Sequence, residues 1–184
     1  MSGRAVFLDR DGVLVETFVR NGHAHAPVSL AEFRICPDAG VQVERLKAGG
    51  LVPIIFTNQP EVARGTLSLL TLDRMHEQLT AVVGVADIFV CPHEDRDGCD
   101  CRKPKPGMLH AAATKWALDL PASFVIGDRW RDIEAGEAVG CQTVLIDRPY
   151  SACRRADVRV ADLVRAVDAV VARAATPGPG VLSR

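Results

Sequence analysis

Near the start of the chain stands the segment Ala5-Val6-Phe7-Leu8-Asp9-Arg10-Asp11-Gly12, a short apolar run followed by two aspartates. Such a run is too short for a helix and is typical of a buried β-strand. Similar runs recur along the 184 residues, and we expect strands at 5–8, 51–56, 87–90, 124–126 and 143–146. Segments of helical periodicity lie between them. This alternation predicts a doubly wound α/β domain, a three-layer α/β/α Rossmann-like fold with a mainly parallel sheet.

The helical segments also set the expected limits of the domain. Amphipathic periodicity is present at 38–47, 72–83, 109–116 and 163–171. Proline precedes the first and third of these segments, as is common where helices begin. We expect residues 1–173 to form one domain and residues 174–184, which contain Pro177-Gly178-Pro179-Gly180, to form a flexible tail.

Composition narrows the class of protein. Hydrophobic residues make up 48% of the chain, and 22 basic residues nearly balance 23 acidic ones. This balance argues against a surface built for nucleic acid or for an anionic membrane. No apolar run approaches the roughly 18 residues that span a bilayer, and the first apolar run is too short for a signal peptide. We expect a cytoplasmic monomer with no nucleic-acid or membrane partner.

Polar side chains follow four of the expected strands where each strand ends. They are Asp9 and Asp11, then Thr57-Asn58-Gln59, Cys91-Pro92-His93 and Gly127-Asp128-Arg129. Ligands of doubly wound sheets bind at the carboxyl ends of the strands. Neighbouring carboxylates repel each other unless a cation or a shared proton relieves them, and carboxylate oxygens suit Mg²⁺. Alternatively, each aspartate only caps the helix that follows it.

Arg10 stands between the two aspartates. Successive side chains of an extended chain point to opposite sides. We therefore expect Arg10 to point away from Asp9 and Asp11 and to take no part in the chemistry.

Three cysteines and one histidine lie within a single loop, residues 91–101. They are Cys91, His93, Cys99 and Cys101. Four such ligands at close spacing predict a closed, tetrahedral Zn²⁺ site with a structural role. The polar residues 94–98 cannot form a core of their own, so metal ligation would give the loop its order. Cys36, Cys141 and Cys153 stand alone, and we expect them to be small buried side chains or idle thiols.

Taken in order, these motifs resemble those of the haloacid-dehalogenase-like phosphatases. The matching segments are Phe7-Leu8-Asp9-Arg10-Asp11-Gly12, Thr57-Asn58-Gln59, Cys101-Arg102-Lys103-Pro104 and Gly127-Asp128-Arg129 with Asp132. The resemblance implies that Asp9 is the nucleophile, which forms an aspartyl-phosphate. It implies that Asp11 protonates the leaving alcohol and later activates water.

The resemblance also assigns the groups that bind phosphate and metal. Thr57 and Lys103 would hold the phosphoryl oxygens. Asp9, the backbone carbonyl of Asp11 and Asp128 would bind Mg²⁺. Asp132 has two interpretations: it orients Lys103 or a metal-bound water, or it solvates a helix face.

The intervals between the motifs are too short for an inserted cap domain, so we expect a capless, open site. A capless member with this zinc loop is similar to two branches of the family, which act on D-glycero-D-manno-heptose 1,7-bisphosphate and on histidinol phosphate. The segments Lys105-Pro106-Gly107-Met108-Leu109 and Ala63-Arg64-Gly65 resemble the heptose branch. That resemblance implies removal of the C7 phosphate, on the route to nucleotide-activated heptose. Pro60-Glu61 and residues 21–25 depart from the branch, in loops that would face substrate.

Asn58, Arg64 and Arg102 are the expected substrate contacts. A guanidinium fork suits a phosphate that is held but not cleaved, although Arg64 could equally be an exposed loop residue. We expect His23 and His25 to lie in a solvated loop.

Two alternatives stay open: a histidinol-phosphate phosphatase and a phosphatase for another small sugar phosphate. A polynucleotide 3′-phosphatase would share the open site, but no basic stripe or kinase P-loop supports it. The intact set of Asp9, Asp11, Thr57, Lys103 and Asp128 argues against a zinc-stabilised binding module that merely retains phosphatase-like residues.

Overall fold

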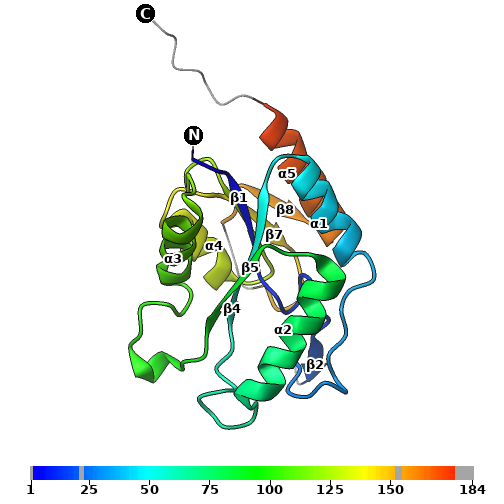
Figure 1. The fold of residues 1–184 in the computed structure, drawn as a ribbon, viewed down its shortest axis with the longest axis vertical. Coiled ribbons are helices and arrows are strands. Elements are labelled where there is room, and N and C mark those ends of the chain that lie inside the picture. Colours follow the sequence, from blue (N-terminus) through cyan, green and yellow to red (C-terminus); the bar gives the residue numbers. More distant parts are fainter. Residues whose placement is uncertain (1, 21–22, 152–154, 177–184) are drawn as a thin grey trace, which may run out of the picture.

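The central sheet has six parallel strands in the order β5-β4-β1-β6-β7-β8 (Figure 1). The computed structural model describes residues 2–20, 23–151 and 155–176. The strands are β1 (Ala5–Leu8), β4 (Val52–Asn58), β5 (Asp87–Cys91), β6 (Phe124–Gly127), β7 (Gln142–Ile146) and β8 (Val158–Val160). The predicted α/β class with a parallel sheet is confirmed, and β8 is an additional strand at one edge.

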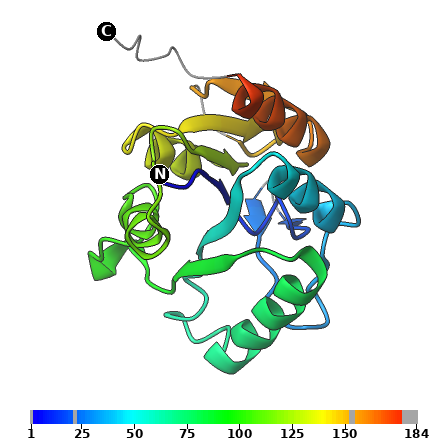
Figure 2. The same ribbon diagram turned by 45° about the horizontal axis from the view of Figure 1, so that its top comes forward.

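Helices cover both faces of this sheet, which gives three layers (Figures 1 and 2). One face carries α1 (Ala39–Ala48), α2 (Leu69–Val83) and α5 (Leu163–Ala175), and the other carries α3 (Gly107–Trp116) and α4 (Trp130–Glu137). Helix α4 is too short to show clear periodicity in the sequence. Helix α5 continues past residue 173, where we expected the domain to end, and residues 177–184 of the expected tail lie outside the described residues. None of the helices in the described ranges has the length and apolar character needed to cross a membrane.

Strand β1 lies in the middle of the sheet and is buried on both faces, as is typical of parallel sheets. Val6 and Leu8 pack toward α1, α2 and α5, whereas Ala5 and Phe7 pack toward α3 and α4. Leu8 pairs with Ile55 of β4 on one side and Ile126 of β6 on the other. This register brings the residues that follow the three strands to one edge of the sheet.

A small hairpin lies between β1 and α1. It consists of β2 (Phe18–Arg20) and β3 (His23–His25), which pair antiparallel. Residues 21 and 22 fall outside the described residues. Arg129 donates a hydrogen bond from Nη2 to the carbonyl oxygen of Ala24 at 3.1 Å, which ties the hairpin to the segment after β6. The sequence did not predict these short strands, and they form a wall rather than a cap domain.

Candidate active site

The expected site residues gather around one cavity of about 390 Å³ at the carboxyl ends of the strands. Its lining includes Asp9, Asp11, Asn58, Arg64, Arg102 and Lys103. Thr57 and Asp128 are buried and do not belong to the lining of this cavity. The lining also includes Arg129, which belongs to a motif noted in the sequence, and two groups that the sequence did not single out, Asp95 and Arg131. His25, which we expected in a solvated loop, is exposed and borders the cavity.

Three buried carboxylates form an acidic cluster next to this cavity. Asp9, Asp128 and Asp132 each offer an oxygen, and these oxygens lie within 4.8 Å of one another. Burial, and then the charge of Asp9, raises the pKa of Asp128 to about 7. Oδ1 of Asp128 is buried and has no hydrogen-bond partner among the described residues. Oxygen ligands with excess negative charge fit a hard divalent cation such as Mg²⁺.

Lys103 neutralises part of this cluster from below. Its side chain is about 3% exposed, with Nζ 2.9 Å from Asp9 Oδ1 and 2.6 Å from Asp132 Oδ1. Burial alone would lower the pKa of Lys103, but Asp132 and Asp9 outweigh it and raise that pKa, so the amine is cationic. Asp132 is therefore a partner of Lys103, and the alternative that it solvates a helix face is wrong.

Two glycines allow the close approach of these groups. A Cβ at Gly127 would lie 2.3 Å from the Cβ of Asp132, so the glycine lets α4 begin directly against β6. Gly12 has φ +88°, and a Cβ there would lie 1.9 Å from Asp128 Oδ2. Larger residues at either position would push the carboxylates apart.

Arg10 contradicts the expectation that it points away from the aspartates. It is fully buried, and its Nε and Nη2 donate to the carboxylate of Asp11 at 3.1 and 2.9 Å. Gln59 Nε2 donates to the same carboxylate at 2.7 Å. The alternation rule fails because the extended strand ends at Leu8 and the chain then turns. Nη1 of Arg10 lies 3.2 Å from Nε2 of His76, whose pKa is lowered to about 4 by burial and by Arg10.

Thr57 and Asn58 occupy the end of β4 and have different hydrogen-bond partners. The hydroxyl of Thr57 accepts a hydrogen bond from Gln59 at 3.0 Å. The amide of Asn58 makes two bonds to the backbone of Lys103: it accepts from the nitrogen at 3.1 Å and donates to the oxygen at 3.2 Å. Asn58 thus fixes the main chain that carries Lys103, in addition to lining the cavity.

Arginines form the rim of the cavity. Arg102 and Arg131 both bind Asp95 Oδ1, each at 2.8 Å. These two arginines hold the pKa of Asp95 well below its usual range, Arg131 most strongly. Arg64 pairs with Glu94 at 2.6 Å. Glu94 and Asp95, which lie in the loop between Cys91 and Cys101, therefore tie this loop to the arginines that line the cavity.

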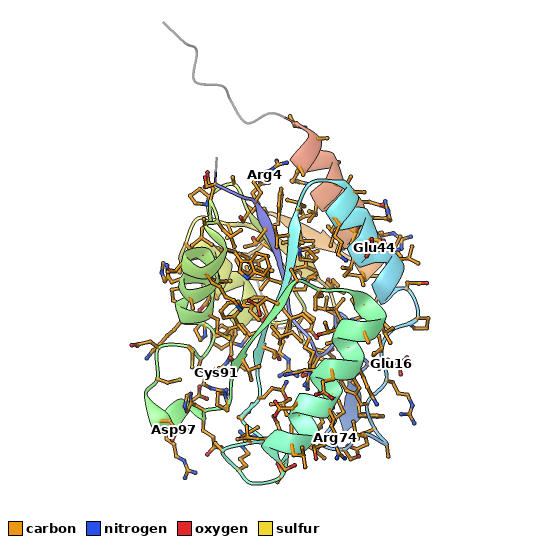
Figure 3. The ribbon with its side chains drawn as sticks, viewed as in Figure 1. Arg4, Glu16, Glu44, Arg74, Cys91 and Asp97 are labelled. Carbon is orange, nitrogen blue, oxygen red and sulfur yellow. The ribbon has the colours of Figure 1, made fainter. Side chains whose placement is uncertain are left out.

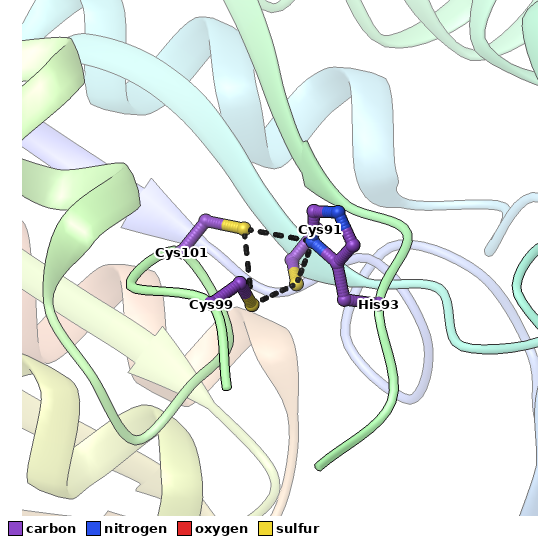
Figure 4. Close-up of side chains that lie close together, drawn as sticks. All are labelled: Cys91, His93, Cys99 and Cys101. Carbon is purple, nitrogen blue, oxygen red and sulfur yellow. Dashed lines mark hydrogen bonds between the residues drawn. The ribbon is translucent and has the colours of Figure 1, made fainter. Parts of the chain in front are cut away.

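Cys91 is the last residue of β5 (Figure 3), and the four predicted zinc ligands lie together there (Figure 4). Cys91 Sγ lies 3.7 Å from both Cys99 Sγ and His93 Nδ1, and Cys101 Sγ lies 3.5 Å from Cys99 Sγ and 3.3 Å from His93 Nδ1. Sulfur atoms around a tetrahedral Zn²⁺ are about 3.8 Å apart. The cluster therefore has the chemistry and the dimensions of a closed zinc site.

The other cysteines lie apart from this cluster. Cys141 is buried, and its thiol donates to the carbonyl oxygen of Leu120 at 3.1 Å. Cys36 is half-buried against the core. Cys153 lies outside the described residues.

The arrangement of charges shows what the site can do. A carboxylate beside a buried ammonium group, with room for a divalent cation, is suited to attack on phosphorus. Guanidinium groups at the rim suit a phosphorylated substrate. Fold and site together define a hydrolase of phosphate esters that is built on a doubly wound α/β fold.

Comparisons with known proteins agree with this class. The HAD-hydrolase-like family model matches residues 100–171. The D-glycero-beta-D-manno-heptose-1,7-bisphosphate 7-phosphatase of Pseudomonas putida is 39% identical over 149 residues, covering 78% of this chain and 82% of the relative. The alpha-anomer enzyme of Photorhabdus laumondii is 34% identical, covering 80% and 86%. The chain belongs to the haloacid-dehalogenase-like hydrolases and is a phosphatase.

A solved structure shares the same architecture. The D,D-heptose 1,7-bisphosphate phosphatase from B. bronchiseptica, complexed with magnesium and phosphate, superposes with a TM-score of 0.77 at 28% identity. The match covers 92% of this chain and 98% of that one. The likeness therefore extends over nearly the whole domain.

Proposed function

We propose that this phosphatase is Mg²⁺-dependent and removes the C7 phosphate of D-glycero-D-manno-heptose 1,7-bisphosphate through an aspartyl-phosphate, on the route to nucleotide-activated heptose. The observation that carries the proposal is the position of Asp9, 2.9 Å from the buried Lys103 amine and beneath a rim of arginines. The names of the similar enzymes support the choice of substrate.

We assign the role of nucleophile to Asp9. Its Oδ1 receives hydrogen bonds from the Arg10 backbone nitrogen at 2.8 Å and from Lys103 at 2.9 Å. We assign the attack on phosphorus to this carboxylate, which forms a phosphorus–oxygen bond while the ester bond to the sugar breaks. When bound by Asp9, Asp128 and the backbone carbonyl of Asp11, Mg²⁺ would screen the repulsion between carboxylates and phosphate.

Asp11 supplies and removes the protons. In its neutral form it would protonate the departing sugar alkoxide, which leaves Asp11 ionised. The ionised form would then take a proton from the water that attacks the aspartyl-phosphate, releasing inorganic phosphate and restoring Asp9. The bonds from Arg10 and Gln59 hold this ionised form in place. Lys103 and Thr57 would bind the phosphoryl oxygens during both steps.

The rim favours a bisphosphate over histidinol phosphate. Arg64, Arg102 and Arg131 surround the mouth of the cavity, where a second phosphate would be held but not cleaved. Histidinol phosphate carries an amine and an imidazole at that end, which offer no second anion for these guanidinium groups to hold.

A substrate panel tests this choice. We expect one or both heptose 1,7-bisphosphate anomers to be hydrolysed with a kcat/KM at least about 100-fold higher than histidinol phosphate, since each hydrogen bond from a charged group to the second phosphate is worth about 1.5–3 kcal/mol. Phosphate release would be measured with equal Mg²⁺ for both anomers, histidinol phosphate, simple sugar phosphates and a 3′-phosphorylated oligonucleotide. A preference for histidinol phosphate would overturn the proposed substrate.

We further propose that the Cys91, His93, Cys99 and Cys101 cluster holds a structural Zn²⁺. The three thiols ligate zinc only when they are reduced, which accords with a cytoplasmic enzyme. The ion pair of Asp95 with Arg131 joins the loop to α4, and Cys101 directly precedes Arg102. The metal would therefore order the loop that positions the rim, without taking part in the reaction.

Loss of zinc should impair catalysis indirectly. We expect freshly purified protein to contain one zinc per chain, and Cys99→Ser to lose most of it with a drop of about tenfold or more in kcat/KM. Metal analysis and phosphate release in excess Mg²⁺ measure both effects. Cys36→Ser, whose thiol lies outside the cluster, is the matched control and should keep its zinc and activity. Freshly prepared protein without zinc would refute the site.

A further inference from the structure

The single tyrosine of the chain, Tyr150, lies directly against the acidic cluster. It follows β7 in a loop that the catalytic motifs do not include. Its hydroxyl donates a hydrogen bond to Asp128 Oδ2 at 2.7 Å. The hydroxyl of Thr17 lies 3.2 Å from the same phenol oxygen, so Thr17 can donate to the phenol while the phenol donates to Asp128.

This contact makes the two oxygens of Asp128 unequal. Asp128 is fully buried. Oδ2 is satisfied by Tyr150, whereas Oδ1 is buried with no partner in the described part of the chain. A buried carboxylate oxygen without a partner is costly. The phenol therefore fixes the rotation of the carboxylate so that one oxygen stays available to a cation.

The loop that carries Tyr150 is itself tied to the segments that follow β1 and β6. Ser151 donates from Oγ to the backbone oxygen of Asp128 and accepts from the Arg148 nitrogen at 2.9 Å. Arg148 Nη2 donates to the carbonyl oxygen of Gly12 at 3.1 Å. A Cβ at Gly12 would approach the phenol oxygen to 3.0 Å. The backbone on both sides thus holds the phenol against Asp128.

We propose that Tyr150 is a positioning residue for the divalent cation of this site, acting through its hydrogen bond to Asp128. The proposal rests on the proposed Mg²⁺ dependence and adds to it a residue outside the catalytic motifs. Carboxylates that ligate metals are commonly oriented by such outer hydrogen bonds, and their loss typically costs 10–100-fold in metal affinity.

Tyr150→Phe tests the proposal because it removes the hydroxyl and keeps the ring. Mn²⁺ binding to the zinc-loaded full chain would be titrated by electron paramagnetic resonance without substrate, with Mg²⁺ as competitor. We expect the Kd for Mn²⁺ to rise about tenfold. The matched control, Thr17→Val, leaves the bond from Tyr150 to Asp128 intact and should change the Kd by less than about twofold. Asp128→Asn should abolish binding at the site.

A second measurement uses the unaltered protein. With ¹³C at the ring carbon that bears the hydroxyl, the single tyrosine gives one resonance, which should shift on titration with Mg²⁺ and stay constant in Asp128→Asn. An unchanged Kd in Tyr150→Phe, or a constant resonance while wild-type protein binds Mn²⁺, would overturn the role of Tyr150. Wild-type protein that binds neither cation would instead refute the proposed Mg²⁺ dependence, and this inference with it.

Discussion

Asp9→Asn should lower kcat/KM for heptose 1,7-bisphosphate by at least about a thousandfold, the scale seen when a nucleophile that acts as part of a unit is removed. An amide has the shape of the carboxylate but cannot form the aspartyl-phosphate. It can still accept the hydrogen bonds from Arg10 and Lys103, so the fold should survive. Phosphate release at saturating Mg²⁺ measures the effect.

The control for this variant is the same substitution at an aspartate that lies outside the cavity. Asp73 lies exposed on α2, and Asp73→Asn should retain wild-type kinetics. Acid-quenched wild-type protein should carry one phosphate on the peptide that contains Asp9, and Asp9→Asn should carry none. Near-normal turnover by Asp9→Asn would show that another group attacks phosphorus.

Lys103→Met should both destabilise the protein and nearly abolish its activity. Removing one partner of a buried ion pair leaves uncompensated charge and costs about 3–5 kcal/mol, and here Asp9 and Asp132 would both lose their cation. Loss of a charge that stabilises the phosphoryl group should lower kcat by about a hundredfold or more. Urea unfolding and phosphate release measure the two effects separately.

A double variant separates stability from catalysis. Lys103→Met with Asp132→Asn removes one buried negative charge together with the lysine, and the introduced amide oxygen would still accept from the Arg129 backbone nitrogen, as Oδ2 of Asp132 does. We expect it to recover part of the lost unfolding free energy but none of the activity. A Lys103→Met protein as stable as wild type would contradict the assigned ion pairs.

The sheet and the centre of the site follow from short-range patterns. Buried parallel strands appear in the sequence as apolar runs, and the limits predicted for β1 are those observed. Parallel register then brings the residues after these runs to one edge, so the sequence alone predicts that Asp9 and Asp128 lie near each other. The zinc loop is equally predictable because its four ligands are local in sequence.

The features that could not be predicted from the sequence depend on the three-dimensional geometry of the folded chain. Arg10 turns toward Asp11 because the backbone leaves the extended conformation after Leu8. The strands β2, β3 and β8 each have three residues, too few to show periodicity. Arg131 meets Asp95 of the zinc loop, and Tyr150 meets Asp128, only through tertiary contacts between separate segments.

We expect changes in the hairpin of β2 and β3 to alter the range of substrates more than the rate of the chemical step. Ala24 and His25 border the cavity, but the reacting groups come from other segments. The hydrogen bond from Arg129 reaches the backbone oxygen of Ala24, so the anchor does not depend on the side chain at that position. New side chains can therefore be introduced along this wall by directed evolution while the anchor and the chemistry beneath it are preserved.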